Sequence, residues 1–371
     1  MTHLKKSAFT HKERLITFDL LRGFFILVIV IDHLQRWPGV FDWLTGQGRL
    51  WASAAEGFIL ISGLMLGLIR GHKDKDKPFS IVAKRILYRA FTLYIWALII
   101  TFITYILIKY YQGQIFPYPP GLDSFSKYYN DILEIFSLQA TLGWTIFLMY
   151  YAVFLALAPL AIYLLRKNMW WLVLAISFCV WLVSLYKQSY FLSWQLLFFN
   201  ATVFGFYFYT FAEKWRHLKY RKVIKLMVIS FALITLFLSV VTIFGWNIVK
   251  SSHSPISLDQ FIQYREFIDQ YFIRKRLLPP QYLIALSWFA TLYFIFHKYE
   301  PFINKWFGWL LLQFGYRSLF VYILQGILIL PLSMIVLYTP NIIINVLITL
   351  SFILMLWALT KIKLLHKFIP S

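Results

Sequence analysis

Long runs of apolar residues alternate with short polar segments along the whole chain. At about 20 apolar residues per crossing of a bilayer, these runs predict about ten transmembrane helices. The helices are expected near residues 15–36, 52–70, 86–109, 143–165, 169–187, 192–211, 224–248, 280–297, 314–336 and 342–362. The segments between them leave no room for a separate soluble domain. The pattern therefore predicts an all-α polytopic membrane protein, a helical bundle with one domain over residues 1–371.

The polar segments also predict the orientation of the chain. With the N-terminus inside, the cytoplasmic segments hold 24 Lys and Arg residues and the opposite segments hold 10. This bias follows the positive-inside rule and predicts that both termini are cytoplasmic. The two longest non-helical stretches, 110–142 and 249–279, then face outside. The basic residues of the second stretch fit either a solvated loop that touches lipid headgroups or a lid over an anionic or sugar ligand.

The composition agrees with a membrane protein. Hydrophobic residues make up 60% of the chain and charged residues 14%, against roughly a quarter charged in a soluble domain. The formal net charge of +21 lies in short loops between apolar runs, so the bilayer is the expected partner and no nucleic-acid binding is predicted. Cys179 is the single cysteine, which leaves no intrachain disulfide and no thiolate metal site.

The first apolar helix carries ionisable side chains that are costly inside a membrane. Arg22 and His33 are eleven residues apart, a step that returns to nearly the same helix face with a rise of about 16 Å. Asp19 lies within reach of an ion pair with Arg22. An ionisable side chain at membrane depth by default marks a site or a pathway, so Arg22, Asp32 and His33 are candidate site residues. The plainer alternatives are an interfacial histidine and a snorkelling arginine anchor.

The second helix carries a narrow stripe of small residues and one carboxylate. Ser53, Glu56, Gly63 and Gly67 follow helical spacing, so a neighbouring backbone can approach closely while Glu56 points into the bundle. The connection to the first helix is short, which favours a position of Glu56 near His33. A carboxylate beside an imidazole raises its basicity, as a general base requires. A purely structural Glu56 is the alternative.

The third helix begins with basic residues on the predicted cytoplasmic side. Arg85 and Arg89 are one turn apart, and with Lys84 they are suited to grip the phosphates of a cytosolic ligand. A plain positive-inside anchor explains the three residues about equally well.

These residues together resemble a known family. An Arg and a His separated by ten residues in the first helix, followed by the run Glu-Gly-Phe-Ile-Leu-Ile-Ser-Gly in the second, are similar to the acyltransferase 3 superfamily of integral membrane O-acyltransferases. The closer resemblance is to the OpgC type, whose members succinylate periplasmic glucans. Further matching segments are 19–23, 31–33, 84–89, 194–198 and 315–322.

The resemblance implies a ten-helix bundle in the inner (cytoplasmic) cell membrane that moves an acyl group, such as succinyl or acetyl, from cytosolic acyl-CoA to a hydroxyl of an extracytoplasmic glycan. Acyl-CoA would be the donor substrate, with no permanently bound cofactor. His33 would be the catalytic residue, Arg22 its partner, and Arg85 and Arg89 the donor-side pair. Many members carry a second histidine where this chain has Gln325, which could still hydrogen-bond substrate.

The residue types fit this chemistry independently of the family resemblance. Acyl transfer from a thioester to a sugar hydroxyl needs a base, and His33 can act as that base or accept the acyl group itself. Aromatic residues in the outer segments, among them Trp37, Trp43, Trp51 and Tyr118, suit either sugar stacking or an interfacial belt. A proton-coupled transporter or flippase is the main alternative, although the sequence shows no pair of Gly- or Pro-broken helices in matching halves. An inactive membrane scaffold is a third alternative.

Overall fold

The fold is seen in a computed structural model that describes residues 15–111, 143–250, 256–273 and 275–369. All regular structure in these residues is helical: α1 (Ile16–Leu34), α2 (Asp42–Thr45), η1 (Gly46–Gly48), α3 (Ala54–Leu66), η2 (Gly67–Lys73), α4 (Phe79–Tyr110), α6 (Gly143–Arg166), α7 (Trp170–Lys187), α8 (Tyr190–Phe206), α9 (Phe208–His217), α10 (Arg221–Val249), α11 (Leu258–Asp269), η4 (Gln270–Phe272), α12 (Pro279–Lys298), α13 (Glu300–Tyr316), α14 (Ser318–Ile335), α15 (Ile342–Leu359) and α16 (Leu365–Phe368). Expectations for residues 1–14, for the outer segment that contains Tyr118 and for Arg274 lie outside the described residues.

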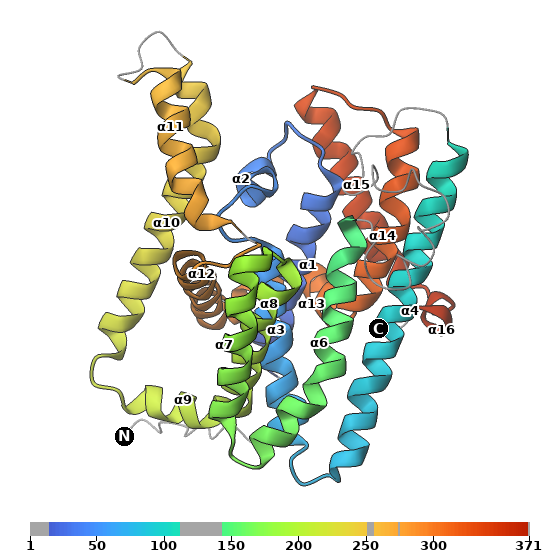
Figure 1. The fold of residues 1–371 in the computed structure, drawn as a ribbon. Helices are drawn as coiled ribbons and strands as arrows, with labels where there is room; N and C mark the ends of the chain where they lie inside the picture. Colours follow the sequence, from blue (N-terminus) through green and yellow to red (C-terminus); the bar gives the residue numbers. More distant parts are fainter. Residues whose placement is uncertain (1–14, 112–142, 251–255, 274, 370–371) are drawn as a thin grey trace, which may run out of the picture.

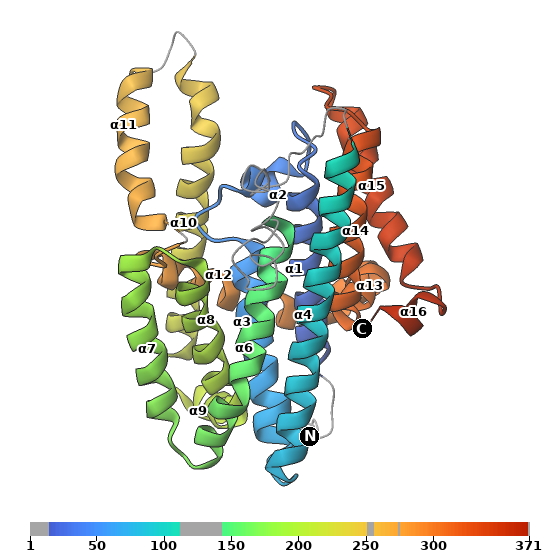
Figure 2. The ribbon, with the colours of Figure 1, turned by 45° about the vertical axis from the view of Figure 1, so that its right-hand side comes forward.

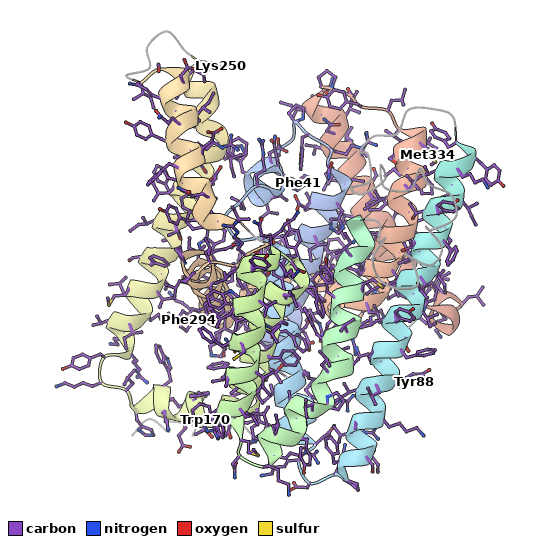
Figure 3. All side chains as sticks on the ribbon, viewed as in Figure 1. Phe41, Tyr88, Trp170, Lys250, Phe294 and Met334 are labelled. Carbon is purple, nitrogen blue, oxygen red and sulfur yellow. The ribbon has the colours of Figure 1, made fainter. Side chains whose placement is uncertain are left out.

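Each of the ten predicted segments contains a helix. In the described residues, seven helices are long and apolar enough to cross a membrane, or eight if the bent pair α8–α9 counts as one span. Large apolar and aromatic side chains cover much of the outer surface, as Figure 3 shows for Tyr88 on α4 and Trp170 on α7. These features indicate a multi-pass membrane protein. Helix α1 falls outside the seven because three charged residues interrupt it, and the exact number of crossings stays a prediction.

Three parts of the fold differ from the sequence-based prediction. Helix α13 occupies a segment that the sequence predicted to be a loop. The charged residues of this segment interrupt its apolar pattern, although its inner face buries Leu311 and Phe314. The outer stretch 249–279 contains α11, which begins in a capping box between Ser257 and Gln260. The predicted helix 192–211 is broken, since α9 turns away from α8 by 71°.

The helices share two ends, which Figures 1 and 2 show from two sides. The basic turns 74–78 and 167–169 lie at the lower end in Figure 1, which we call the inner end, and the turn 218–220 lies at the lower left. The segment 35–53 and the turn 336–341 lie at the opposite, outer end. This separation of basic turns matches the charge count, whereas the cytoplasmic placement of the termini stays a prediction.

Close backbone contacts hold α1 in the middle of the bundle. A Cβ atom on Gly23 would overlap the carbonyl oxygen of Leu311 in α13, and one on Gly315 would overlap the carbonyl oxygen of Asp19 in α1. Small residues allow this approach, and the backbones then gain dispersion contacts along their length. The predicted seam on α3 is confirmed in the same way, because Gly63 and Gly67 pack against backbone carbonyls of α8.

The first prediction tests the contact between α1 and α13. Gly315→Ala should destabilise the protein by about 1–3 kcal/mol, because the added methyl group meets rigid backbone. Gly308→Ala is the matched control on the same helix, where the new methyl meets only the movable end of the Asn304 side chain. Thermal unfolding in detergent measures both, and equal melting temperatures for the two variants would contradict the close contact.

Candidate active site

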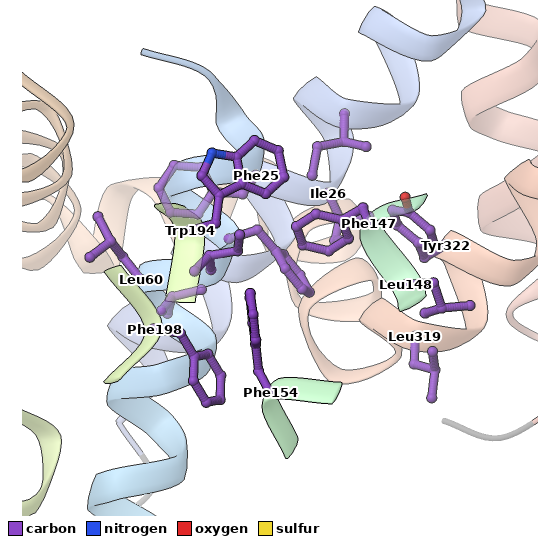
Figure 4. Packing of buried hydrophobic residues seen from close by; sticks show 14 of the residues in the cluster. Phe25, Ile26, Leu60, Phe147, Leu148, Phe154, Trp194, Phe198, Leu319 and Tyr322 are labelled. Carbon is purple, nitrogen blue, oxygen red and sulfur yellow. The ribbon is translucent and has the colours of Figure 1, made fainter. Parts of the chain in front are cut away.

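A cavity opens toward the inner end where α1, α3, η2, α4, α6 and α14 meet. Its charged and hydroxyl-bearing lining consists of Arg22, Ser62, Arg70, Arg85, Arg89, Tyr151, Ser318 and Tyr322. Apolar side chains complete the wall, and Figure 4 shows four of its lining residues, Phe147, Leu148, Leu319 and Tyr322, lying together. The cavity thus combines four guanidinium groups with an apolar wall, which suits a ligand that has an anionic part and a less polar chain.

Arg22 belongs to this cavity. Its Nε donates a hydrogen bond to the carbonyl oxygen of Gly315 at 2.6 Å, and its Nη2 lies 3.0 Å from Oδ1 of Asp19. The predicted Asp19–Arg22 ion pair is therefore confirmed. The pair and the carbonyl hold the guanidinium in place at the start of α14, whose Ser318 lines the same cavity.

His33 lies farther along α1 and contacts α14. Its Nδ1 is 3.0 Å from Nε2 of Gln325, and its ring meets the Tyr322 ring nearly edge-on, with centroids 6.2 Å apart. Tyr322 also lines the cavity and packs against Phe147, so its ring stands between the arginine-lined space and His33. Arg22 and His33 thus lie at two levels of α1, separated by a rise of about 16 Å, and they contact different helices: Arg22 meets α13 and His33 meets α14.

The expected approach of Glu56 to His33 gives no hydrogen bond between them, because His33 pairs with Gln325 and Glu56 pairs with Ser53 and Gln281. Glu56 is fully buried at the start of α3, where its Oε2 accepts hydrogen bonds from the backbone N–H and the hydroxyl of Ser53. Its Oε1 accepts from Nε2 of Gln281 at 3.0 Å. The carboxylate thus satisfies the donors of a helix start, which is a structural use.

Asp32 points to a different element from its neighbour His33. A Cβ on Gly48 would lie 3.1 Å from Oδ1 of Asp32, so this carboxylate faces the short outer segment that contains η1. Of the outer tryptophans, Trp51 is buried and stacked on Phe272 at 4.1 Å, which makes it a packing residue. Trp43 is 64% exposed and stays available to a ligand or to lipid.

The donor-side residues divide into two groups. All three are exposed, but only Arg85 and Arg89 line the cavity, and Lys84 lies outside the lining. Arg70 of η2 completes the lining and was not singled out from the sequence. The spacing of Ser62, Leu66 and Arg70, one residue per turn along a single stripe, is the signal that could have identified it.

A network of charges holds Arg70 at the inner mouth of the cavity. Its Nη1 lies 2.9 Å from Oδ2 of Asp74, and Nζ of Lys77 lies 2.7 Å from Oδ1. Burial raises the pKa of the Asp74 carboxyl, but the hydrogen bonds from Lys77 and Arg70 outweigh it and hold the pKa below its usual range. Arg166 adds a hydrogen bond to the Asp74 carbonyl oxygen at 2.6 Å. The turn 74–78 is therefore tied to η2 through Arg70 and to α6 through Arg166.

A helical membrane bundle with a half-buried histidine beyond an arginine-lined cavity defines the class of protein, a multi-pass membrane protein with a cavity between its helices. The chain belongs to the OpgC family, since the family model described as OpgC protein matches residues 14–367. Membership indicates a transferase of the acyl type that modifies glucans. No curated protein and no solved structure matches the chain.

The second prediction concerns the structural use of Glu56. Glu56→Ala should destabilise the protein by about 1–3 kcal/mol, because the donors of Ser53 and the Gln281 amide lose a buried acceptor. Glu56→Gln should stay close to the wild type, since a glutamine serves in a capping box and Gln281 can turn its amide to present an oxygen. Thermal unfolding in detergent measures both variants, and a Gln variant as unstable as the Ala variant would contradict this role.

Proposed function

We propose that this protein is an acyl-CoA-dependent O-acyltransferase of the acyltransferase 3 superfamily, which moves an acyl group such as succinyl or acetyl to an extracytoplasmic glycan. The single observation that carries the proposal is the cavity lined by Arg22, Arg70, Arg85 and Arg89, which ends at Tyr322 beside His33. Membership of the OpgC family supports the acyl chemistry and the glucan acceptor.

The inner arginines suit the donor. Coenzyme A carries phosphates, and guanidinium groups bind phosphate oxygens through paired, charge-assisted hydrogen bonds. The pantetheine arm is a slender chain, which fits the apolar wall formed by Phe147, Leu148 and Leu319. The rise of about 16 Å from Arg22 to His33 is close to the length of that arm when extended. The thioester would then reach the imidazole while the nucleotide stays at the inner mouth.

His33 supplies the base in this proposal. Its Nε2 takes the proton of the glycan hydroxyl as the hydroxyl oxygen bonds to the thioester carbonyl carbon. The carbon–sulfur bond then breaks, and the imidazolium returns the proton to the departing CoA thiolate. The ester and the free thiol are the products, so no further reactant is needed. Glycan approaches from the outer end, where the segment 35–53 follows α1.

The third prediction tests His33. His33→Ala should lower acyl transfer by at least about a hundredfold, because the hydroxyl loses its base, while acyl-CoA still binds. Transfer is measured with radiolabelled acyl-CoA and an isolated glucan in detergent or vesicles, and donor binding by calorimetry. A fully active His33→Ala variant would overturn the role of this residue, and a wild-type protein without transfer would favour a transporter.

The fourth prediction tests the donor-side arginines. The double variant Arg85→Gln/Arg89→Gln should raise the KM for acyl-CoA about tenfold or more with a smaller effect on kcat, because phosphate contacts form before the chemical step. Lys84→Gln is the matched comparison, since Lys84 lies on the same helical turn but outside the cavity. Its donor KM should stay within about twofold of the wild type. An unchanged KM in the double variant would reduce Arg85 and Arg89 to topology anchors.

A further inference from the structure

Gln325 occupies the position on α14 that meets the imidazole of His33. Its side chain is fully buried, and its Nε2 lies 3.0 Å from Nδ1 of His33. Its Oε1 is buried without a hydrogen-bond partner among the described residues. A buried amide with one unpaired polar atom commonly costs about 1–3 kcal/mol of folding free energy, so its position beside the histidine suggests a functional role.

The amide of Gln325 has two orientations, related by a half turn about its last side-chain bond, and each selects one tautomer of His33. When the N–H2 group faces Nδ1, that nitrogen must accept, and the proton of the neutral ring sits on Nε2. When the amide oxygen faces Nδ1, that nitrogen must donate, and Nε2 carries the free lone pair. Only the second arrangement gives the ring a basic nitrogen that points away from α14.

We propose that Gln325 is the positioning residue of the site: its amide oxygen accepts the Nδ1–H of His33 and thereby holds Nε2 as the base. This inference rests on the proposed function. A glutamine here does the work that a carboxylate does beside many catalytic histidines, which is to fix the tautomer and the ring orientation. The Glu56 carboxylate does not fill this place, because Ser53 and Gln281 engage it.

The structure places Nε2 of Gln325 toward Nδ1 of His33 and leaves Oε1 open, so the proposed arrangement is this one after a half turn about the last side-chain bond. Both orientations keep the amide against the ring, because the amide oxygen and nitrogen exchange places in the half turn. Tyr322, one turn before Gln325 on α14, also meets the His33 ring, so both of these contacts come from the same helix.

The fifth prediction separates the two orientations. Gln325→Leu removes the hydrogen bond and should lower kcat about tenfold to a hundredfold with little change in the KM for acyl-CoA. Gln325→Glu keeps an acceptor for the Nδ1–H of His33 but has no donor when ionised. Its kcat should therefore be well above that of the Leu variant and close to that of the wild type. A Glu variant as inactive as the Leu variant, or a Leu variant with wild-type kcat, would overturn the proposal.

A matched control removes a buried amide elsewhere. Gln195 on α8 is also buried and pairs with the hydroxyl and the carbonyl oxygen of Ser177, far along the sequence from α1 and α14. Gln195→Leu should keep kcat within about threefold of the wild type. A loss equal to that in Gln325→Leu would mean that any buried amide is needed for packing.

A spectroscopic measurement makes the test independent of turnover. Nitrogen-15 NMR of protein with histidine labelled at Nδ1, with His33→Ala used to assign the signal, reports whether Nδ1 of His33 carries the proton. We expect a protonated Nδ1 in the wild type and a mixture of tautomers in Gln325→Leu. An unprotonated Nδ1 at neutral pH overturns the inference about Gln325 even if acyl transfer is found, whereas a protonated Nδ1 without any transfer overturns the proposed function alone.

Discussion

Helix α1 lies so close to α13 that neither Gly23 nor Gly315 has room for a side chain, and the site depends on this contact. The close approach brings the carbonyl oxygen of Gly315 within a hydrogen bond of Arg22. Helix α14 begins at Ser318, only three residues after Gly315, so its first turns follow α1 toward the outer end. Gln325 then reaches His33. The backbone contact between α1 and α13 thus positions both Arg22 and His33.

The charged side chains of this bundle are accommodated in two different ways. Glu56 accepts hydrogen bonds from neutral donors of Ser53 and Gln281, so both of its carboxylate oxygens are engaged. The cavity arginines outnumber the carboxylates paired with them, since Asp19 serves Arg22 and Asp74 serves Arg70. This surplus of cations in one cavity attracts anions.

The proposed reaction needs a donor and an acceptor that approach from opposite sides of a membrane. The arginines lie toward the inner end and His33 toward the outer end of the same helix, with the ring of Tyr322 between them. In the proposed reaction only the narrow thioester arm, and not the whole donor, would approach the histidine. Tyr322 and Phe147, which pack against each other with ring centroids 5.5 Å apart, form the wall of the cavity on that side.

The sequence by itself determined the class of protein, the ten helical segments and the shared face of Arg22 and His33, because apolar run length and helical periodicity are local properties. It also predicted the Asp19–Arg22 pair and the small-residue seam on α3 for the same reason. Only the tertiary structure decided that Gln325 partners His33 while Glu56 caps α3, since contacts between residues hundreds of positions apart depend on how helices pack. The sequence did not predict helix α13, because polar residues interrupt its apolar pattern and its buried face is defined only by packing against α1.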